Sequence, residues 1–472
     1  MFRAGHNLAP ARGQTGRENK VTRASSKSRR LSHRATALVA AGLSVGTAAT
    51  VAIAVPIATS SAQSAPTASI QVWMEASGTP VDNYWAAQAK AFDQANPGDS
   101  VSIDIEPSGT YNTKVATGLA GTNAPALFFG WGGGDLQTFI NSKVVQPMAD
   151  AGESNAGNPS WKSAFVASSL GAVTFNNEIY GIPLGGTQPV FFFYNKALMA
   201  RYHLSFPTTT TQLISDVTLL AKHNVTAIAL NDSGGWPGLM YLEYFTDRIG
   251  GPQVFVNIQN RQKGAWSNPA IIQALKDIQT LVKDSAFEQG YQDISFGTGF
   301  TEAMIHNGVA AMELMGDWDI GFFQGYYPGW VATDAMGIGF FPTVPGGKGN
   351  PADLEGNTTD YLELASHISP AETYVAEKFA AFLCASPAYA KFEVSQGLVP
   401  VIAGSSSLFA SSPLKEYLVP IYDAVQKAPY FQYSWDKALG ATRATPLYTN
   451  LENVFDLTET PAQFAKAMNA YQ

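Results

Sequence analysis

A chain of 472 residues is too long to fold around one core, and its length predicts two domains of ordinary size. Apolar residues make up 46% of it, enough for two cores, whereas charged residues make up only 14%, as is common in secreted proteins. Residues 1–62 contain nine Lys or Arg and one acid, so the 20 basic and 36 acidic residues that follow give a formal charge of −16. Because a surface of that sign repels phosphate backbones, the sequence excludes nucleic acid as a partner.

The N-terminal segment has the order of basic, apolar and small residues that is typical of a secretory signal. The basic pair Arg29-Arg30 precedes an apolar run at 35–58, and small residues follow up to Ala62, after which we expect cleavage. Cleavage after Ala65 is the alternative, and the basic pair leaves twin-arginine export open. A run of this length also reaches across a bilayer at about 1.5 Å per residue, so an uncleaved N-terminal anchor competes with full secretion.

Strands and helices alternate after this segment. A buried strand is predicted at 69–74, and apolar residues at helical spacing predict a helix over 84–92, which Asn96-Pro97-Gly98 ends. Further strands are predicted at 101–105, 126–131 and 226–230, and further helices at 207–223, 237–250 and 269–284. The alternation predicts an α/β class with parallel sheets.

Three segments carry patterns that occur together in one protein family. In residues 180–196 a Gly-Ile-Pro turn leaves one strand, a polar Gly-Thr-Gln-Pro follows, and a buried strand ends at Tyr194-Asn195-Lys196. The second pattern ends at Gly316-Asp317-Trp318, and the third, within 376–400, ends in Gln-Gly-Leu-Val-Pro. In this order the three patterns resemble the bacterial extracellular solute-binding proteins, the sugar-binding family that feeds ABC importers. The resemblance covers nearly all of the chain after the signal.

The resemblance implies a periplasmic-binding-protein-like fold, in which three crossovers join two α/β lobes and the ligand lies in the cleft between them. The crossovers are expected near Thr187-Gln188, at 358–361 and at 404–407. The expected division is a signal segment at 1–62, a first lobe at 66–187 and 361–405, and a second lobe at 188–360 and 406–472. Gram-positive members are usually acylated on a cysteine at the cleavage site, but the only cysteine here, Cys384, lies far away inside a predicted helix.

Candidate ligand contacts on the first lobe follow its predicted strands. Sugars present flat C–H patches and polar edges, so a site for them needs aromatic faces beside carboxylate or amide groups, and such groups collect at the carboxyl ends of strands. Trp131 ends a strand before three glycines that let a ligand approach the backbone, and Asp135 either binds hydroxyls or only caps the next helix. The other candidates are Glu75, Tyr111, Asn112 and, on the first crossover, Gln188.

Candidate contacts on the second lobe include the family's Gly-x-Trp element, here Gly316-Asp317-Trp318, and the resemblance implies that Trp318 lies under a sugar ring. The segment after the strand at 226–230 opens a helix and offers an amide, a carboxylate and an indole, although it is also consistent with a plain helix-starting loop. The candidates of this lobe are Asn231, Asp232, Trp236, Asp317, Trp318, Trp435 and Asp436.

The sequence offers no persuasive catalytic or metal site. The histidines after the signal have no metal-ligand spacing, so no metal or other cofactor is expected. A glycoside hydrolase needs two carboxylates on opposite sides of one bond, but a strand would place Asp317 and Asp319 on one face. Neither a Gly-x-Ser-x-Gly nor a His-Glu-x-x-His motif is present. A secreted glycoside hydrolase and a surface glycan sensor or adhesin remain the alternatives.

We therefore predict a non-enzymatic solute-binding component of an ABC importer. It would capture a neutral sugar in the interlobe cleft and deliver it to a membrane permease, and candidate aromatics on both lobes favour an oligosaccharide. A sugar that contacts both lobes would stabilise their closed arrangement. We expect a monomer that is exported to the cell surface, or to the periplasm of a Gram-negative cell.

Overall fold

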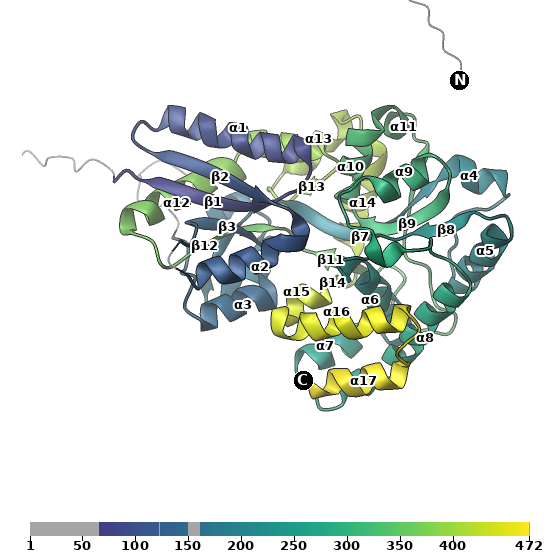
Figure 1. The fold of residues 1–472 in the computed structure, drawn as a ribbon. Coiled ribbons are helices and arrows are strands. Elements are labelled where there is room, and N and C mark those ends of the chain that lie inside the picture. The colour runs from purple at the N-terminus through teal and green to yellow at the C-terminus, as the bar shows by residue number, and fades with distance from the viewer. Residues whose placement is uncertain (1–65, 122, 150–160, 472) are drawn as a thin grey trace, which may run out of the picture. The chain divides into compact units, whose positions relative to one another are not determined.

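The computed structural model describes residues 66–121, 123–149 and 161–471. The expected signal segment at 1–62 lies outside the described residues. Two hydrophobic cores and two main sheets organise the described chain, and Figure 1 labels most of their elements.

The first sheet has the strand order β2-β1-β3-β12-β6. Strand β1 (Ser69–Glu75) pairs in parallel with β2 (Ser100–Glu106) and with β3 (Leu127–Gly130). Strand β12 (Tyr361–Leu364) runs antiparallel to both β3 and β6 (Gly181–Pro183). The predicted strands are confirmed, but the prediction of parallel sheets is wrong for this mixed sheet. The reason is that β12 enters through a short connection from the second sheet and not through a crossover helix, which parallel strands require.

Helices cover the first sheet because each presents one apolar face to it. In α1 (Thr79–Ala95) the buried residues Trp85, Ala89 and Phe92 recur at helical spacing, which confirms the predicted helix. Helix α12 begins with a capping box at Ser369, which satisfies amide groups of its first turn. The helices of this lobe are α1, α2 (Ser108–Leu119), α3 (Gly133–Asn141) and α12 (Pro370–Cys384), and a small hairpin joins β4 (Thr174–Phe175) to β5 (Glu178–Ile179).

The second sheet has the order β14-β11-β7-β9-β8. Its central strand β7 (Gly186–Asn195) contains the fully buried run Phe191-Phe192-Phe193, as expected of a strand covered on both faces. β7 runs antiparallel to all four of its partners, whereas β8 pairs with β9 and β14 pairs with β11 in parallel. These strands are β8 (Thr226–Ala229), β9 (Ala310–Gly316), β10 (Met336–Gly339), β11 (Leu354–Asn357) and β14 (Phe431–Tyr433).

The remaining helices belong mainly to the second core, and the helices predicted at 207–223, 237–250 and 269–284 are among them. They are α4 (Lys196–Arg201), α5 (Thr210–Lys222), α6 (Trp236–Gly250), α7 (Gln253–Gln259), α8 (Pro269–Lys283), α9 (Phe300–His306), α10 (Asp319–Tyr326), α11 (Pro328–Ala332), α13 (Pro387–Ser395), α14 (Lys415–Lys427), α15 (Trp435–Leu439), α16 (Ala441–Phe455) and α17 (Pro461–Ala470).

The chain passes between the two cores in three regions, which confirms the predicted two-lobed α/β class. The first two passages lie between Leu184 and Val190 and between Leu354 and Tyr361. In the third region, which runs from residue 389 to residue 409, Tyr389 and Val401 pack in the first core, whereas Val394, Val399 and Phe409 pack in the second. Strand β13 (Val399–Pro400) pairs with Gly186 and Thr187 at the start of β7, so the first and third connections lie side by side. The residue-by-residue boundaries of the lobes stay a prediction.

Candidate functional site

A cavity of about 840 Å³ is lined by residues of both lobes. Its volume is in the range of small-molecule sites. Strand β1 ends in Glu75, which lines the cavity, and Ser108 and Trp131 follow the ends of β2 and β3. The carboxyl ends of the parallel strands therefore face the cavity, where open α/β sheets bind their ligands.

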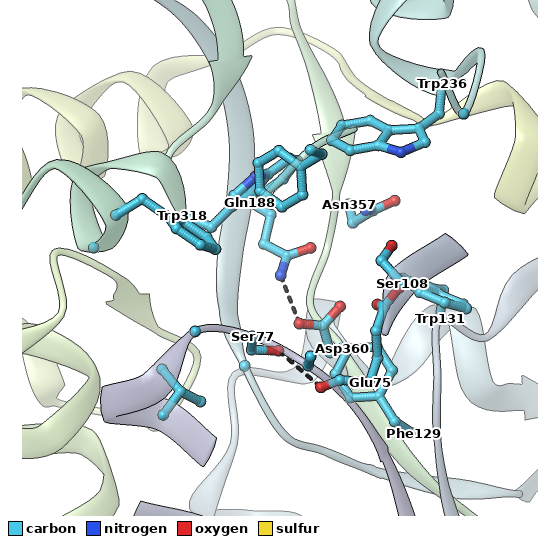
Figure 2. Close-up of a pocket in the computed structure, with 18 of the residues that line it drawn as sticks. Glu75, Ser77, Ser108, Phe129, Trp131, Gln188, Trp236, Trp318, Asn357 and Asp360 are labelled. Atoms are coloured by element: carbon cyan, nitrogen blue, oxygen red, sulfur yellow. Dashed lines mark hydrogen bonds between the residues drawn. The ribbon is translucent and has the colours of Figure 1, made fainter. Parts of the chain in front are cut away.

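The first lobe and the crossovers supply a polar side to the cavity, which Figure 2 shows around Glu75, Ser77, Ser108 and Asp360. Gln188 on the first crossover donates a hydrogen bond of 2.6 Å from Nε2 to Oδ2 of Asp360 on the second. Burial, followed by the charge of the neighbouring Glu75 carboxyl, raises the pKa of Asp360 to about 8. These groups can exchange hydrogen bonds with the hydroxyls of a ligand.

The second lobe supplies an aromatic side. Five partly exposed rings line the cavity in a continuous row, and they come from α6, from α10 and the residue before it, and from the segment before α9: Trp318, Trp236, Phe296, Phe322 and Tyr326. Successive ring centroids are 6.0, 5.1, 5.1 and 6.4 Å apart in that order. Such a row can cover the apolar faces of more than one sugar ring.

The position of Trp318 explains why its motif needs a glycine. The indole lies over Gly316, where an added Cβ would be only 2.0 Å from the ring. Glycine at that position therefore lets the ring fold back over the end of β9 toward the cavity.

Lys437 brings a positive charge to the lining of the cavity, and this charge interacts with a carboxylate and an aromatic ring of the protein itself. Its Nζ lies 3.1 Å from Oδ2 of Asp436 and 3.7 Å from the ring centroid of Trp131. Burial by itself would lower the pKa of Lys437, but the Asp436, Asp135 and Glu75 carboxyls raise it above its ordinary value. Burial by itself would raise the pKa of Asp436, but the charge of Lys437 and hydrogen bonds from Tyr448 and Ser434 lower it below its ordinary value.

Two buried acceptors also line the cavity. Oδ1 of Asn357, a residue only 8% exposed, has no hydrogen-bond partner within the described part of the chain. Burial raises the pKa of Glu355 well above its usual range, and the adjacent Glu243 carboxyl raises it further, which is the behaviour of two acids that share a proton. A ligand that donates hydrogen bonds would satisfy these groups.

Seven of the thirteen predicted contacts line the cavity, and the structure thus brings them together from distant parts of the chain. They are Glu75, Asn112, Trp131, Gln188, Trp236, Trp318 and Asp436. Their contact with a ligand stays a prediction.

Three other predicted contacts lie in the cores and do not line the cavity. Tyr111 is fully buried, and its hydroxyl donates to the carbonyl of Phe129 at 2.7 Å. Trp435 is fully buried and stacks on Phe255 with ring centroids 4.6 Å apart. Asp317 is also fully buried, and its burial, followed by the charge of Asp360, raises its pKa well above the usual range.

The remaining three are engaged by polar groups of the chain. Asn231 donates from Nδ2 to the Thr301 hydroxyl at 3.1 Å, and Asp232 accepts the Gly238 amide at 2.8 Å, near the start of α6. Asp135 accepts the amide of Ala441, at the start of α16 in the other lobe, at 2.7 Å. The alternative that it caps the next helix is wrong, because α3 has no side-chain cap.

The sequence analysis missed several lining residues. Asp360 lies within the predicted second crossover, so the reasoning that selected Gln188 would also have found it. The aromatic residues Phe296, Phe322 and Tyr326 carry no comparable signal, because they lie in a loop and along a helix and not after a strand.

Neither a metal-binding cluster nor a membrane-spanning helix is present in the described ranges. Within 66–121, 123–149 and 161–471 no group of three or more His, Cys, Asp or Glu side chains is arranged to hold a metal ion. Across the same residues no helix combines the length and apolar character needed to cross a membrane.

Comparisons with known proteins agree with this architecture. The chain is 24% identical over 348 residues to an uncharacterised ABC transporter extracellular-binding protein of Pyrococcus horikoshii, covering 72% of this chain and 71% of that one. A solved structure from work on xylan utilization by the thermophilic bacterium Caldanaerobius polysaccharolyticus matches with a TM-score of 0.76, 24% identity, and coverage of 85% and 99% of the two chains. A chitin oligosaccharide binding protein matches with a TM-score of 0.74, 19% identity, and coverage of 86% and 98%.

The fold and the cavity thus define a two-lobed protein with a candidate ligand site between its lobes. The sequence profile of the bacterial extracellular solute-binding proteins matches residues 75–390, and the chain belongs to that family.

Proposed function

We propose that this protein is the extracellular solute-binding component of an ABC importer, and that it captures a neutral oligosaccharide in the cavity. The observation that carries the proposal is the two-sided lining, with aromatic rings on the second lobe and hydroxyl-binding groups on the first. Sugars have the matching combination of apolar faces and polar edges. Structural relatives from work on xylan utilization and on chitin oligosaccharides are consistent with a ligand of this class.

The protein would act by reversible binding, without cleaving the sugar. Because ligand contacts come from both lobes, binding stabilises the closed arrangement by its differential affinity, and the closed form then docks on a membrane permease. The protein would be exported, in keeping with its extracellular family, and would work as a monomer without a nucleic-acid partner.

A thermal-shift screen of the purified protein against neutral mono- and oligosaccharides tests this function. A ligand that binds only the folded state raises the unfolding midpoint as its concentration increases. We expect one glycan class to do so and to be recovered unaltered afterwards. Recovery of cleaved sugar would make the protein a glycoside hydrolase, and silence across the panel would indicate a solute that is not a sugar.

Trp318→Ala is expected to weaken binding of that glycan by about 1–3 kcal/mol, because it removes a ring that covers an apolar face of the sugar. Isothermal titration of the variant and the wild type measures the change. Tyr471→Ala is the matched control, because Tyr471 is 52% exposed and does not line the cavity. An unchanged dissociation constant for Trp318→Ala would remove Trp318 from the site.

A further inference from the structure

The two lobes also touch directly at one side of the cavity, next to the second connection, because β14 pairs with β11. Trp131 and Asp135 of the first lobe contact Tyr433, Lys437 and Ala441 of the second, and we name these five residues the clasp. The two sides of the clasp come from distant parts of the sequence, since Trp131 and Tyr433, which form a hydrogen bond, are 302 positions apart.

The backbones at the clasp approach so closely that glycine is required there. An added Cβ on Gly134 would lie 2.5 Å from the amide nitrogen of Gly440 and 2.8 Å from the carbonyl oxygen of Ala438. An added Cβ on Gly133 would lie 2.6 Å from the Tyr433 ring. The glycine run after Trp131 therefore admits the second lobe, whereas the sequence alone suggested that it admits a ligand.

Three specific interactions cross this contact. The Tyr433 hydroxyl donates a hydrogen bond to the Trp131 carbonyl. The Lys437 ammonium lies 3.7 Å from the centroid of the Trp131 ring, so a ligand can stack only on the other face of that ring. Oδ1 of Asp135 accepts the amide of Ala441 at 2.7 Å.

The Asp135 contact satisfies a helix that has no cap of its own. Helix α16 follows Gly440, which has no side chain to accept an amide of the first turn. A carboxylate placed at a helix N-terminus accepts such an amide and interacts favourably with the helix dipole. The first turn of α16 therefore gains its carboxylate cap only while the two lobes are together.

We propose that the clasp, and Asp135 in particular, sets the affinity of the protein by stabilising the closed arrangement of its lobes. This inference rests on the proposed function, because it assigns the regulation of that same cavity. Asp135 is a positioning residue, since it does not line the cavity and acts through lobe closure, by its contact with the Ala441 amide. Because the clasp lowers the free energy of the closed arrangement, less of the ligand's binding free energy is needed to close the lobes, and the apparent affinity rises.

Substitutions in the clasp separate this role from ligand contact. Asp135→Ala should raise the dissociation constant for the glycan found in the screen by about 2- to 30-fold, mainly through a faster off-rate, as expected for a lost cap. Asp135→Asn, which keeps an acceptor oxygen, should recover most of that affinity. Gly134→Ala favours the local helix but places its Cβ against Gly440, so it should raise the dissociation constant at least tenfold.

Gly171→Ala is the matched control, because no atom lies within 4 Å of its added Cβ, and it should bind as the wild type does. Small-angle scattering of the ligand-free proteins provides a readout that needs no sugar. The radius of gyration should be larger for Gly134→Ala and Asp135→Ala than for the wild type and Gly171→Ala. The proposal would be overturned if both Asp135→Ala and Gly134→Ala showed the scattering and the off-rate of the wild type. If the wild type binds no sugar, the proposed function fails, while the scattering comparison still decides whether the clasp holds the lobes together.

Discussion

Trp435→Ala is expected to lower the free energy of unfolding of the second lobe by about 3–5 kcal/mol, the usual cost of removing a large aromatic side chain from a core. Trp435 is fully buried, stacks on Phe255 at 4.6 Å between centroids, and meets Trp266 edge to face at 5.8 Å. Alanine would leave a cavity beneath both rings. Urea unfolding followed by circular dichroism measures the loss.

Trp435→Phe is the matched comparison, because it keeps a ring on Phe255 and removes a buried indole nitrogen that has no hydrogen-bond partner in the described part of the chain. It should cost much less than alanine. The direct effect of either variant on sugar affinity should be small. A variant of wild-type stability that no longer binds sugar would instead make Trp435 a ligand contact, as the sequence had suggested.

The stability of the protein is expected to fall between pH 5 and pH 9, and Asp360 should account for roughly 1–4 kcal/mol of that fall. Burial, followed by the charge of Glu75, raises the pKa of Asp360 to about 8. The folded state therefore keeps a proton that the unfolded chain releases near pH 4. This stabilising contribution is complete below about pH 4 and is lost as the pH rises through 8.

Asp360→Asn isolates this contribution, because asparagine has nearly the same shape and cannot ionise. Its free energy of unfolding should decline less than that of the wild type between pH 5 and pH 9, as measured by urea titration at each pH. Asp423→Asn, at an exposed position of α14, is the matched control and should follow the wild type. If the wild type and Asp360→Asn lose stability in parallel, Asp360 ionises in the folded protein as it does in the unfolded chain.

The sequence predicted the fold well because periodicity and family motifs both constrain it. The strand at 126–131 is apolar along its whole length, the strand at 69–74 contains a buried apolar run at 72–74, and the turn at 180–196 marks a passage between the lobes. Candidates taken from strand ends, such as Trp131 and Glu75, accordingly line the cavity. The antiparallel position of β12 was missed, because pairing between distant segments leaves no mark in local periodicity.

The orientation of single side chains was harder to predict. Trp435 and Asp436 are neighbours, yet the first lies in the core and only the second lines the cavity. Successive residues of a helix point about 100° apart, so the same local signal fits either outcome. Asn231 illustrates a second cause, because its amide is engaged by Thr301, 70 residues away in the chain. Only the folded structure shows which polar groups already have partners.

The single cysteine of the sequence makes local opening of the first lobe measurable by thiol alkylation. Cys384 ends α12 in the first core and is fully buried, and burial, with a further contribution from Glu393, raises the pKa of its thiol well above the usual range. The thiolate is the form that alkylating reagents attack, so the reaction must wait until this lobe opens locally. The rate of alkylation therefore reports how often the first lobe opens locally, and no label has to be introduced. Comparing the alkylation rate with and without ligand would show how far binding at the cavity reduces local opening of the first lobe.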